Sequence, residues 1–177
     1  MPIEQGFVGP RPESFPVEDF VAIDVEIASR RPTSVCAIGA VRVERGREVQ
    51  CMESLIRYQG TVHFTRVHGL RAIDLREAPE WPAVWRSVTA MALGLSVVVA
   101  FRAEFDRGAI LAMCGRHHVR VPALRFHCAA RAAEARLGRR LNLADTVAAL
   151  GLTFPGRPHD ALSDARAAAA VFLACQP

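Results

Sequence analysis

The sequence predicts an α/β fold in which a mixed five-stranded sheet, three strands antiparallel plus two parallel, is flanked by helices. Between residues 19 and 57, short apolar runs of strand length follow one another with only brief links. Beyond residue 80, strand-like runs alternate with segments whose apolar residues recur every three or four positions, as in β-α-β units. The length of 177 residues fits one domain.

The N-terminal part is expected to hold a leader and an antiparallel meander. Residues 1–18 contain four prolines and no periodic pattern, which indicates a flexible Pro-rich leader before a single domain over 19–177. Three strands are then expected at 19–26, 34–44 and 48–57. The last two are separated by the tight-turn sequence Arg45-Gly46-Arg47, and short links of this kind join antiparallel strands.

The rest of the chain is expected to add two parallel strands and most of the helices. Trp81, Val84 and Trp85 are spaced by three and four residues, which places them on one face of a helix at 80–93. The other expected elements are a short helix near Ile73, strands at 96–100 and 124–128, and helices at 104–116, 129–137, 141–150 and 160–175. Right-handed crossovers then place the fourth and fifth strands on the far side of the first strand.

Composition excludes several classes of function. All 22 basic residues are arginine, in a chain of formal net charge +4. Without lysine, a mechanism through a lysine Schiff base is excluded. No apolar run is long enough to span a membrane and the N-terminus lacks a signal-peptide pattern, so no membrane partner is expected. The five cysteines form no C-x-x-C pair, which favours reduced thiols in a cytoplasmic protein.

Acidic side chains at three places depart from the usual distribution in polar loops and on exposed helix faces. Asp24 and Glu26 lie two residues apart at the end of the first strand, so both point to the same face of the sheet. Asp106 lies at the start of the helix after the fourth strand, while His159 and Asp164 lie at the start of the last helix. Each alone has an ordinary explanation as a solvated or helix-end residue. Because the first and fourth strands are expected to be neighbours, however, the fold brings these residues together.

Four converging carboxylates favour hard divalent cations with oxygen ligands, so two Mg²⁺ or Mn²⁺ ions are expected. Two such ions about 3.5–4 Å apart can hold the attacking and leaving oxygens of a phosphodiester displacement. A histidine beside them offers a base that titrates near neutrality and can take the proton of an attacking water. The residues therefore predict metal-dependent phosphodiester hydrolysis.

Three motifs, in this order, resemble those of the DEDDh, or DnaQ-like, 3′–5′ exonucleases of the ribonuclease H-like superfamily. They are FVAIDVEIAS with Asp24 and Glu26, VVVAFRAEFDRGAI with Asp106, and HDALSDARAAA with His159 and Asp164. The resemblance covers about 19–175 and implies a ribonuclease H-like sheet. It implies that Asp24 contacts both metals and that Glu26 and Asp164 hold the metal of the attacking water. It also implies that Asp106 supports the second metal and that His159 is the general base.

Further matches imply where the substrate lies. The strand SVCAIGAVRV resembles the one that follows the first motif in the family. The sequence Val67-His68-Gly69-Leu70 resembles the family's H-G-[IL] turn, which places His68 and Gly69 near the terminal nucleotide. These two residues are therefore expected to contact the substrate.

Two departures from the family pattern fall in the same region. Ile27-Ala28 stands where the family has a small polar residue after D-x-E, and Phe101-Arg102 stands where it has His-Asn. All four residues are candidate substrate contacts. Phe101 either stacks on a base or ends its strand as a core residue, and Arg102 either pairs with a phosphate or is a solvated rim charge.

The resulting hypothesis is a two-metal 3′–5′ exonuclease that acts on 3′ ends of single-stranded DNA, RNA or short oligonucleotides and releases 5′-mononucleotides. Two alternatives stay open: a nucleic-acid-binding or interaction module with the same fold and weak or lost catalysis, and a small-nucleotide phosphodiesterase. The chain ends directly after the last expected helix, so no polymerase-binding tail is expected. The oligomeric state and the choice between DNA and RNA stay open, since the latter depends on contacts to the 2′ position.

Overall fold

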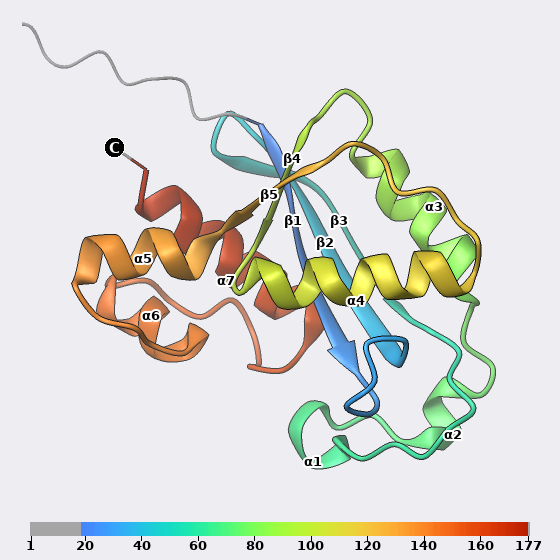
Figure 1. Cartoon of the computed structure of the whole chain (residues 1–177). Helices are drawn as coiled ribbons and strands as arrows, with labels where there is room; N and C mark the ends of the chain where they lie inside the picture. The colour runs from blue at the N-terminus through green and yellow to red at the C-terminus, as the bar shows by residue number, and fades with distance from the viewer. Residues whose placement is uncertain (1–18, 177) are drawn as a thin grey trace, which may run out of the picture.

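The computed structural model describes residues 19–176, and the leader expected over 1–18 lies outside the described residues. Its centre is one mixed sheet with the strand order β3-β2-β1-β4-β5 (Figure 1). The strands are β1 Phe20–Ile27, β2 Val35–Glu44, β3 Arg47–Leu55, β4 Val97–Ala100 and β5 Arg125–Cys128. β2 runs antiparallel to both β1 and β3, whereas β1, β4 and β5 are parallel to one another. The predicted fold class and strand order are thereby confirmed.

Helices cover both faces of the sheet. They are α1 Thr65–His68, α2 Ala72–Leu75, α3 Trp81–Met91, α4 Ala103–Arg116, α5 Ala129–Leu137, α6 Leu143–Ala149 and α7 Ala161–Ala174. Figure 1 shows α3 and α4 on one side of the sheet and α5, α6 and α7 on the other. The single-turn helix α1 was not expected from the sequence, because four residues are too few to show a helical period.

Alternation along β1 sends its side chains to the two faces in turn. Val21, Ile23 and Val25 are buried in the cluster formed with α3 and α4. Phe20 and Ala22 are buried in the other cluster, which includes α5, α6 and α7. Because successive strand residues point to opposite faces, the next even-numbered residues, the two acidic ones, lie on the α7 side of the sheet.

The fourth strand is much shorter than the first. It pairs with β1 only through Val21 with Val98 and Ala22 with Val99. Beyond these pairs β4 ends at Ala100 and the chain turns into α4. The C-terminal half of β1 therefore has one edge that no strand covers, and this edge is open to side chains from α4.

Neither a membrane span nor a disulfide occurs among the described residues. None of their helices is both long and apolar enough to cross a bilayer. All five cysteines are free thiols. Their burial differs, since Cys36 and Cys114 are buried whereas Cys51, on the outer strand β3, is exposed.

The side chains that α4 buries against the sheet are expected to contribute strongly to stability. Ile110 on α4 is fully buried, whereas its neighbour Leu111 is 41% exposed. We expect Ile110→Ala to lower the free energy of unfolding by about 2–5 kcal/mol, because it removes buried methyl groups and leaves a cavity. Leu111→Ala is the matched control and is expected to cost less than about 1 kcal/mol. Equal losses in urea unfolding would contradict this packing.

Candidate active site

The five acidic and histidine residues singled out in the sequence meet at the C-terminal end of β1, on the face covered by α7. Asp24 and Glu26 come from β1, and Asp106 comes from the first turn of α4. Asp164 comes from the first turn of α7, and His159 lies just before that helix. Segments far apart in the sequence thus supply one cluster, as the predicted strand order required.

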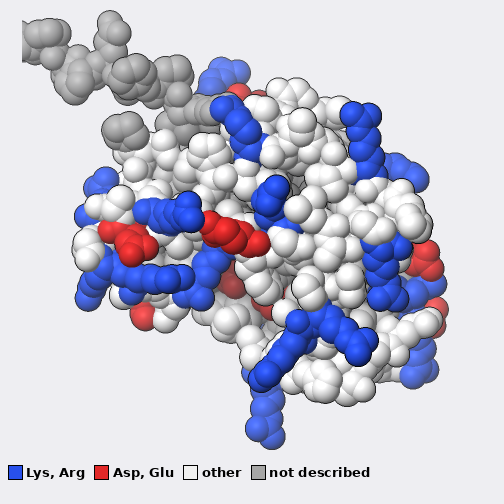
Figure 2. Space-filling view, in the orientation of Figure 1, with Lys and Arg blue, Asp and Glu red and all other residues white. Residues whose placement is uncertain are grey.

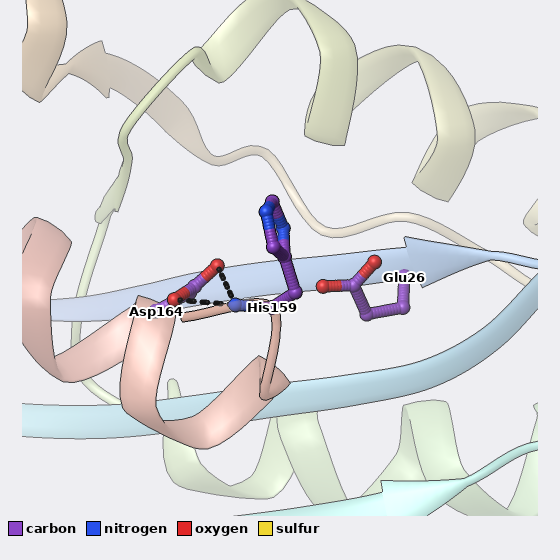
Figure 3. A group of neighbouring side chains, drawn as sticks. All are labelled: Glu26, His159 and Asp164. Carbon is purple, nitrogen blue, oxygen red and sulfur yellow. Dashed lines mark hydrogen bonds between the residues drawn. The ribbon is translucent and has the colours of Figure 1, made fainter. Parts of the chain in front are cut away.

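Three of these side chains lie within reach of one small ion. One potential ligand atom from each of Glu26, His159 and Asp164 lies within 4.8 Å of the others. Figure 3 shows Glu26 pointing toward His159 from the strand, with Asp164 approaching from the helix. Carboxylate oxygens such as those of Glu26 and Asp164 are suited to Mg²⁺ and Mn²⁺.

Asp106 is fixed by the edge of β1 that β4 leaves uncovered. The backbone N–H of Val25 donates a hydrogen bond of 3.1 Å to Asp106 Oδ1, and Asp106 is 3% exposed. If β4 were longer, this N–H would pair with a carbonyl of that strand. Here the carboxylate satisfies it, which places Asp106 beside the strand residues that flank Val25.

The third motif is folded around its own carboxylates. The side chain of Asp160 is the N-cap of α7 and accepts a hydrogen bond of 3.1 Å from the Ser163 N–H. The N–H of His159 donates to both carboxylate oxygens of Asp164, at 3.3 and 3.2 Å (Figure 3). His159 has φ of 63°, a left-handed conformation that few residues other than glycine adopt. Asp164 therefore holds the loop that presents the histidine.

Burial raises the pKa of every carboxyl group in the cluster. Desolvation is the largest cause throughout, and it raises the pKa of Glu26 to about 8, of Asp106 to about 7 and of Asp164 to about 6. The pKa of Asp24 lies well above its ordinary value because of burial and then repulsion from Asp106, Asp164 and Glu26. Carboxylates gathered in this way lack a balancing positive charge, and a bound cation would supply it. The donor set thus fits divalent ions.

Asp160 is an acidic member of this neighbourhood that sequence reasoning did not assign. Its charge raises the pKa of Asp24, Glu26 and Asp164. Its signal in the sequence is the helix N-cap pattern, an aspartate three residues before Ser163 at the start of an apolar helix. That pattern explains its structure without indicating that it also adds negative charge to the site.

The predicted substrate contacts after the first motif differ in exposure. Ile27 is partly buried at the end of β1, whereas Ala28 is fully buried and packs with Cys36 and Leu75. Ala28 also pairs through its backbone, since its N–H donates to the Ser34 carbonyl. The Ala28 side chain is therefore part of the local core beneath the end of β1 and is not open to a substrate.

His68 is buried in a turn that lies next to the site. Its ring is 2% exposed, and Nδ1 accepts a hydrogen bond of 3.0 Å from the Leu70 N–H. Within the described part of the chain, Nε2 is buried with no hydrogen-bond partner, although the Ile27 carbonyl lies close enough to influence the ring. Burial, the largest effect, lowers the pKa of His68, and proximity to His159 adds to this.

Gly69 completes the same turn. It is exposed, with φ of 83°, and ends α1 in the left-handed conformation that glycine adopts without strain. Arg157 lies over it and donates from Nη2 to the His68 carbonyl at 3.3 Å. This contact joins the turn to the loop that carries His159, so both predicted regions border the same site.

Phe101 and Arg102, which depart from the family pattern, have opposite environments. Phe101 is 7% exposed and packs in the core cluster of α5, α6 and α7, the place expected if it ends its strand as a core residue. Arg102 is exposed and lines a surface hollow with Arg131 and Arg140. Figure 2 shows basic side chains scattered over this face, several beside acidic ones, so no continuous basic stripe marks a path.

The sequence was compared with models of known protein families, and one family matches most of the chain. The RNase T family model, described as exonuclease, matches residues 21–172. The chain belongs to this exonuclease family. The residue types of the cluster are those of the DEDDh pattern: Asp24, Glu26, Asp106, Asp164 and His159. No curated protein matches the sequence with significance.

Solved structures show the same fold. The nuclease domain of 3′hExo, a DEDDh family member bound to rAMP, has a TM-score of 0.74 at 13% identity, over 88% of this chain and 90% of that one. Exonuclease X in complex with 5′ overhanging duplex DNA has a TM-score of 0.69 at 21% identity, over 88% and 90%. Exonuclease I of E. coli in complex with a dT13 oligonucleotide has a TM-score of 0.72 at 13% identity, over 89% of this chain and 40% of that one. At these identities the likeness establishes the ribonuclease H-like fold.

Proposed function

We propose that this exonuclease domain hydrolyses phosphodiester bonds from the 3′ end of single-stranded nucleic acid or short oligonucleotides and releases 5′-mononucleotides. The observation that carries the proposal is the cluster of Asp24, Glu26, Asp106 and Asp164 with His159, supplied by three separate elements. The ligands of the structural neighbours, which include rAMP and a dT13 oligonucleotide, support nucleic acid as the substrate.

Two divalent cations, Mg²⁺ or Mn²⁺, are proposed as cofactors. Glu26 and Asp164 would hold one of them, Asp106 would support the other, and Asp24 would contact both. Bound cations would supply positive charge to the phosphoryl oxygens and to the attacking and leaving oxygens. The raised pKa values of these carboxyls indicate that positive charge is needed there, because the chain has no lysine and, among residues 19–176, no arginine contributes to the pKa of Asp24 or Glu26.

His159 is proposed as the general base, since it is exposed and lies beside Glu26 and Asp164. Its backbone is held by Asp164, so its imidazole stays at the edge of the cluster while remaining open to solvent. A base so placed can accept the proton of an attacking water.

The test of the proposal is digestion of oligonucleotides labelled at either end. With Mn²⁺, a 5′-labelled single strand is expected to shorten progressively, whereas a 3′-labelled strand is expected to release labelled mononucleotide at once. EDTA is expected to stop both reactions. Shortening from the 5′ end, or no hydrolysis with Mg²⁺ or Mn²⁺, would refute it. Binding of single strands without hydrolysis would support the binding module, and a strong preference for dinucleotides would support the small-nucleotide phosphodiesterase.

Replacing His159 separates the role of a base from that of a metal ligand. We expect His159→Ala to lower kcat about 100-fold or more with little change in the Kd for Mn²⁺, because a base contributes about that factor. His63→Ala, at an exposed position, is the control and is expected to leave both quantities unchanged. A parallel loss of Mn²⁺ affinity, measured by calorimetry, would show that the imidazole ligates the ion.

Arg102 is proposed to contact a substrate phosphate at the rim. Arg102→Ala is expected to raise KM for an oligonucleotide about tenfold, with kcat nearly unchanged and a weaker dependence of KM on salt. Arg86, exposed on α3, gives the matched control Arg86→Ala, which is expected to leave KM unchanged. If Arg102→Ala also leaves KM unchanged, Arg102 is a solvated rim charge.

A further inference from the structure

One row of residues crosses the three antiparallel strands directly under the start of α7. Asp24 of β1 is paired with Gly39 of β2, and Gly39 is paired with Glu53 of β3. Because paired residues in neighbouring strands point to the same face, this row faces α7. A catalytic candidate, a glycine and a second acid thus lie side by side beneath the helix that carries Asp164.

Gly39 is the point where the helix reaches the sheet. A Cβ at this position would overlap the carbonyl group of Ala161 and the backbone nitrogen of Leu162, both in the first turn of α7. These are backbone atoms, which move only with the helix. The missing side chain therefore sets how closely the first turn of α7 approaches β2.

Glu53 lies at the same helix end. Glu53 is exposed overall, but partial desolvation, the largest influence, and then the charge of Asp160 raise its pKa, and a hydrogen bond from the Leu162 N–H opposes this. The Leu162 N–H is one of the helix N–H groups that have no partner within α7. One turn later, Arg166 donates to Glu48 of β3 from Nε at 3.0 Å and from Nη2 at 2.8 Å. Two successive turns of α7 are thus attached to β3.

We propose that Gly39 and Glu53 are positioning residues that seat the first turn of α7 on the sheet and so fix the spacing between Asp164 and Asp24. Neither residue belongs to the proposed set of catalytic and metal-binding residues. The inference rests on the proposed function, since this spacing matters for the cations that the two carboxylates would share. A helix displaced by a side chain at position 39 carries Asp164 and His159 away from β1.

The test combines Gly39→Ala with a glycine control in the full chain. We expect Gly39→Ala to raise the Kd for Mn²⁺ about tenfold or more and to lower kcat about 100-fold, the effect of a shift of about 1 Å in catalytic groups. Gly115→Ala on α4 is the control, because a Cβ there meets nothing and its φ is not positive. Amide NMR shifts of His159 and Leu162, which need no metal, are expected to move only in Gly39→Ala.

Glu53 provides a second comparison if Gly39→Ala does not fold. Glu53→Ala removes the acceptor of the Leu162 N–H, whereas Glu53→Gln keeps an oxygen acceptor. We expect Glu53→Ala to weaken Mn²⁺ binding several-fold and to shift the Leu162 amide, and Glu53→Gln to restore both toward the wild type. Equal behaviour of the two variants would overturn the role of Glu53.

The outcomes separate this inference from the proposed function. Unchanged amide shifts, Mn²⁺ affinity and kcat in a folded Gly39→Ala variant would overturn the positioning role. If the wild type releases no nucleotides, the exonuclease proposal fails, but the amide shifts and Mn²⁺ affinity of the variants still decide whether Gly39 and Glu53 position α7.

Discussion

Asp24→Asn is expected to reduce nucleotide release by about 1000-fold or more while making the protein more stable in the absence of divalent ions. The rate of nucleotide release is expected to fall because Asp24 is the proposed contact of both cations. Removing charge stabilisation of this kind raises the reaction barrier by several kcal/mol. The gain in stability follows from its raised pKa, since burial and four neighbouring acids disfavour its ionised form. Asparagine has nearly the same shape without the charge.

The measurement is the melting temperature at pH 8 with EDTA and with Mn²⁺, alongside the rate of nucleotide release. In EDTA the variant is expected to melt above the wild type by a few degrees. With Mn²⁺ the order is expected to reverse, because the wild type gains more from the ion. Glu77 is exposed on the link between α2 and α3, and the control variant Glu77→Gln is expected to change neither the melting temperature nor the rate. An Asp24→Asn protein that melts lower in EDTA would contradict the electrostatic account.

The second large effect is the dependence of stability on pH without divalent ions. The pKa values of Glu26, Asp106 and Asp164 are raised to about 8, 7 and 6, from ordinary values of 4.5, 3.8 and 3.8. Between pH 4 and pH 8, therefore, the folded protein holds protons that the unfolded chain has released. Stability from these groups is fully present below about pH 4 and is lost as the pH rises toward 8.

Divalent ions are expected to oppose this loss most strongly at high pH. At a concentration about 100 times Kd, binding adds about 2.7 kcal/mol, which raises the melting temperature of a chain of this size by about 5–10 °C. At pH 5 protons compete for the same carboxylates, so the shift is expected to be small. Melting curves at pH 5, 6, 7 and 8 with EDTA or Mn²⁺ test this. A shift of equal size at all four values would mean that the ion binds elsewhere.

The sequence predicted most of the sheet because its signals are local and repetitive. The apolar runs that became β1, β2 and β4 needed only strand length and burial to be recognised. The helix expected at 141–150 forms as α6, and Asn142 caps it, since its side chain accepts from the Asp145 N–H at 2.8 Å. The short helix α1 was missed because a single turn has no period to detect.

The sequence predicted that the five residues of the proposed active site lie together, but it did not indicate the residues that support them. Asp24, Glu26 and Asp106 stand out because acidic residues at the ends of apolar segments are unusual. Gly39 and Glu53 are ordinary in the sequence, since a glycine in a strand and an exposed acid on an outer strand have many explanations. Their importance depends on which helix lies above them, and only the tertiary structure provides that. Likewise, only the tertiary structure shows that Phe101 lies in the core whereas Arg102 is exposed.

The hydrogen bond from Val25 to Asp106 joins residues 81 positions apart, and the contacts of Asp164 with the strand residues span a longer separation still. No local segment can therefore form the complete site. During synthesis, the chain has to complete α7 before the four carboxylates are brought together, so the proposed nuclease chemistry can begin only when the sheet and both of its helical layers are in place. Binding of a divalent ion at the proposed site would then report that folding is complete.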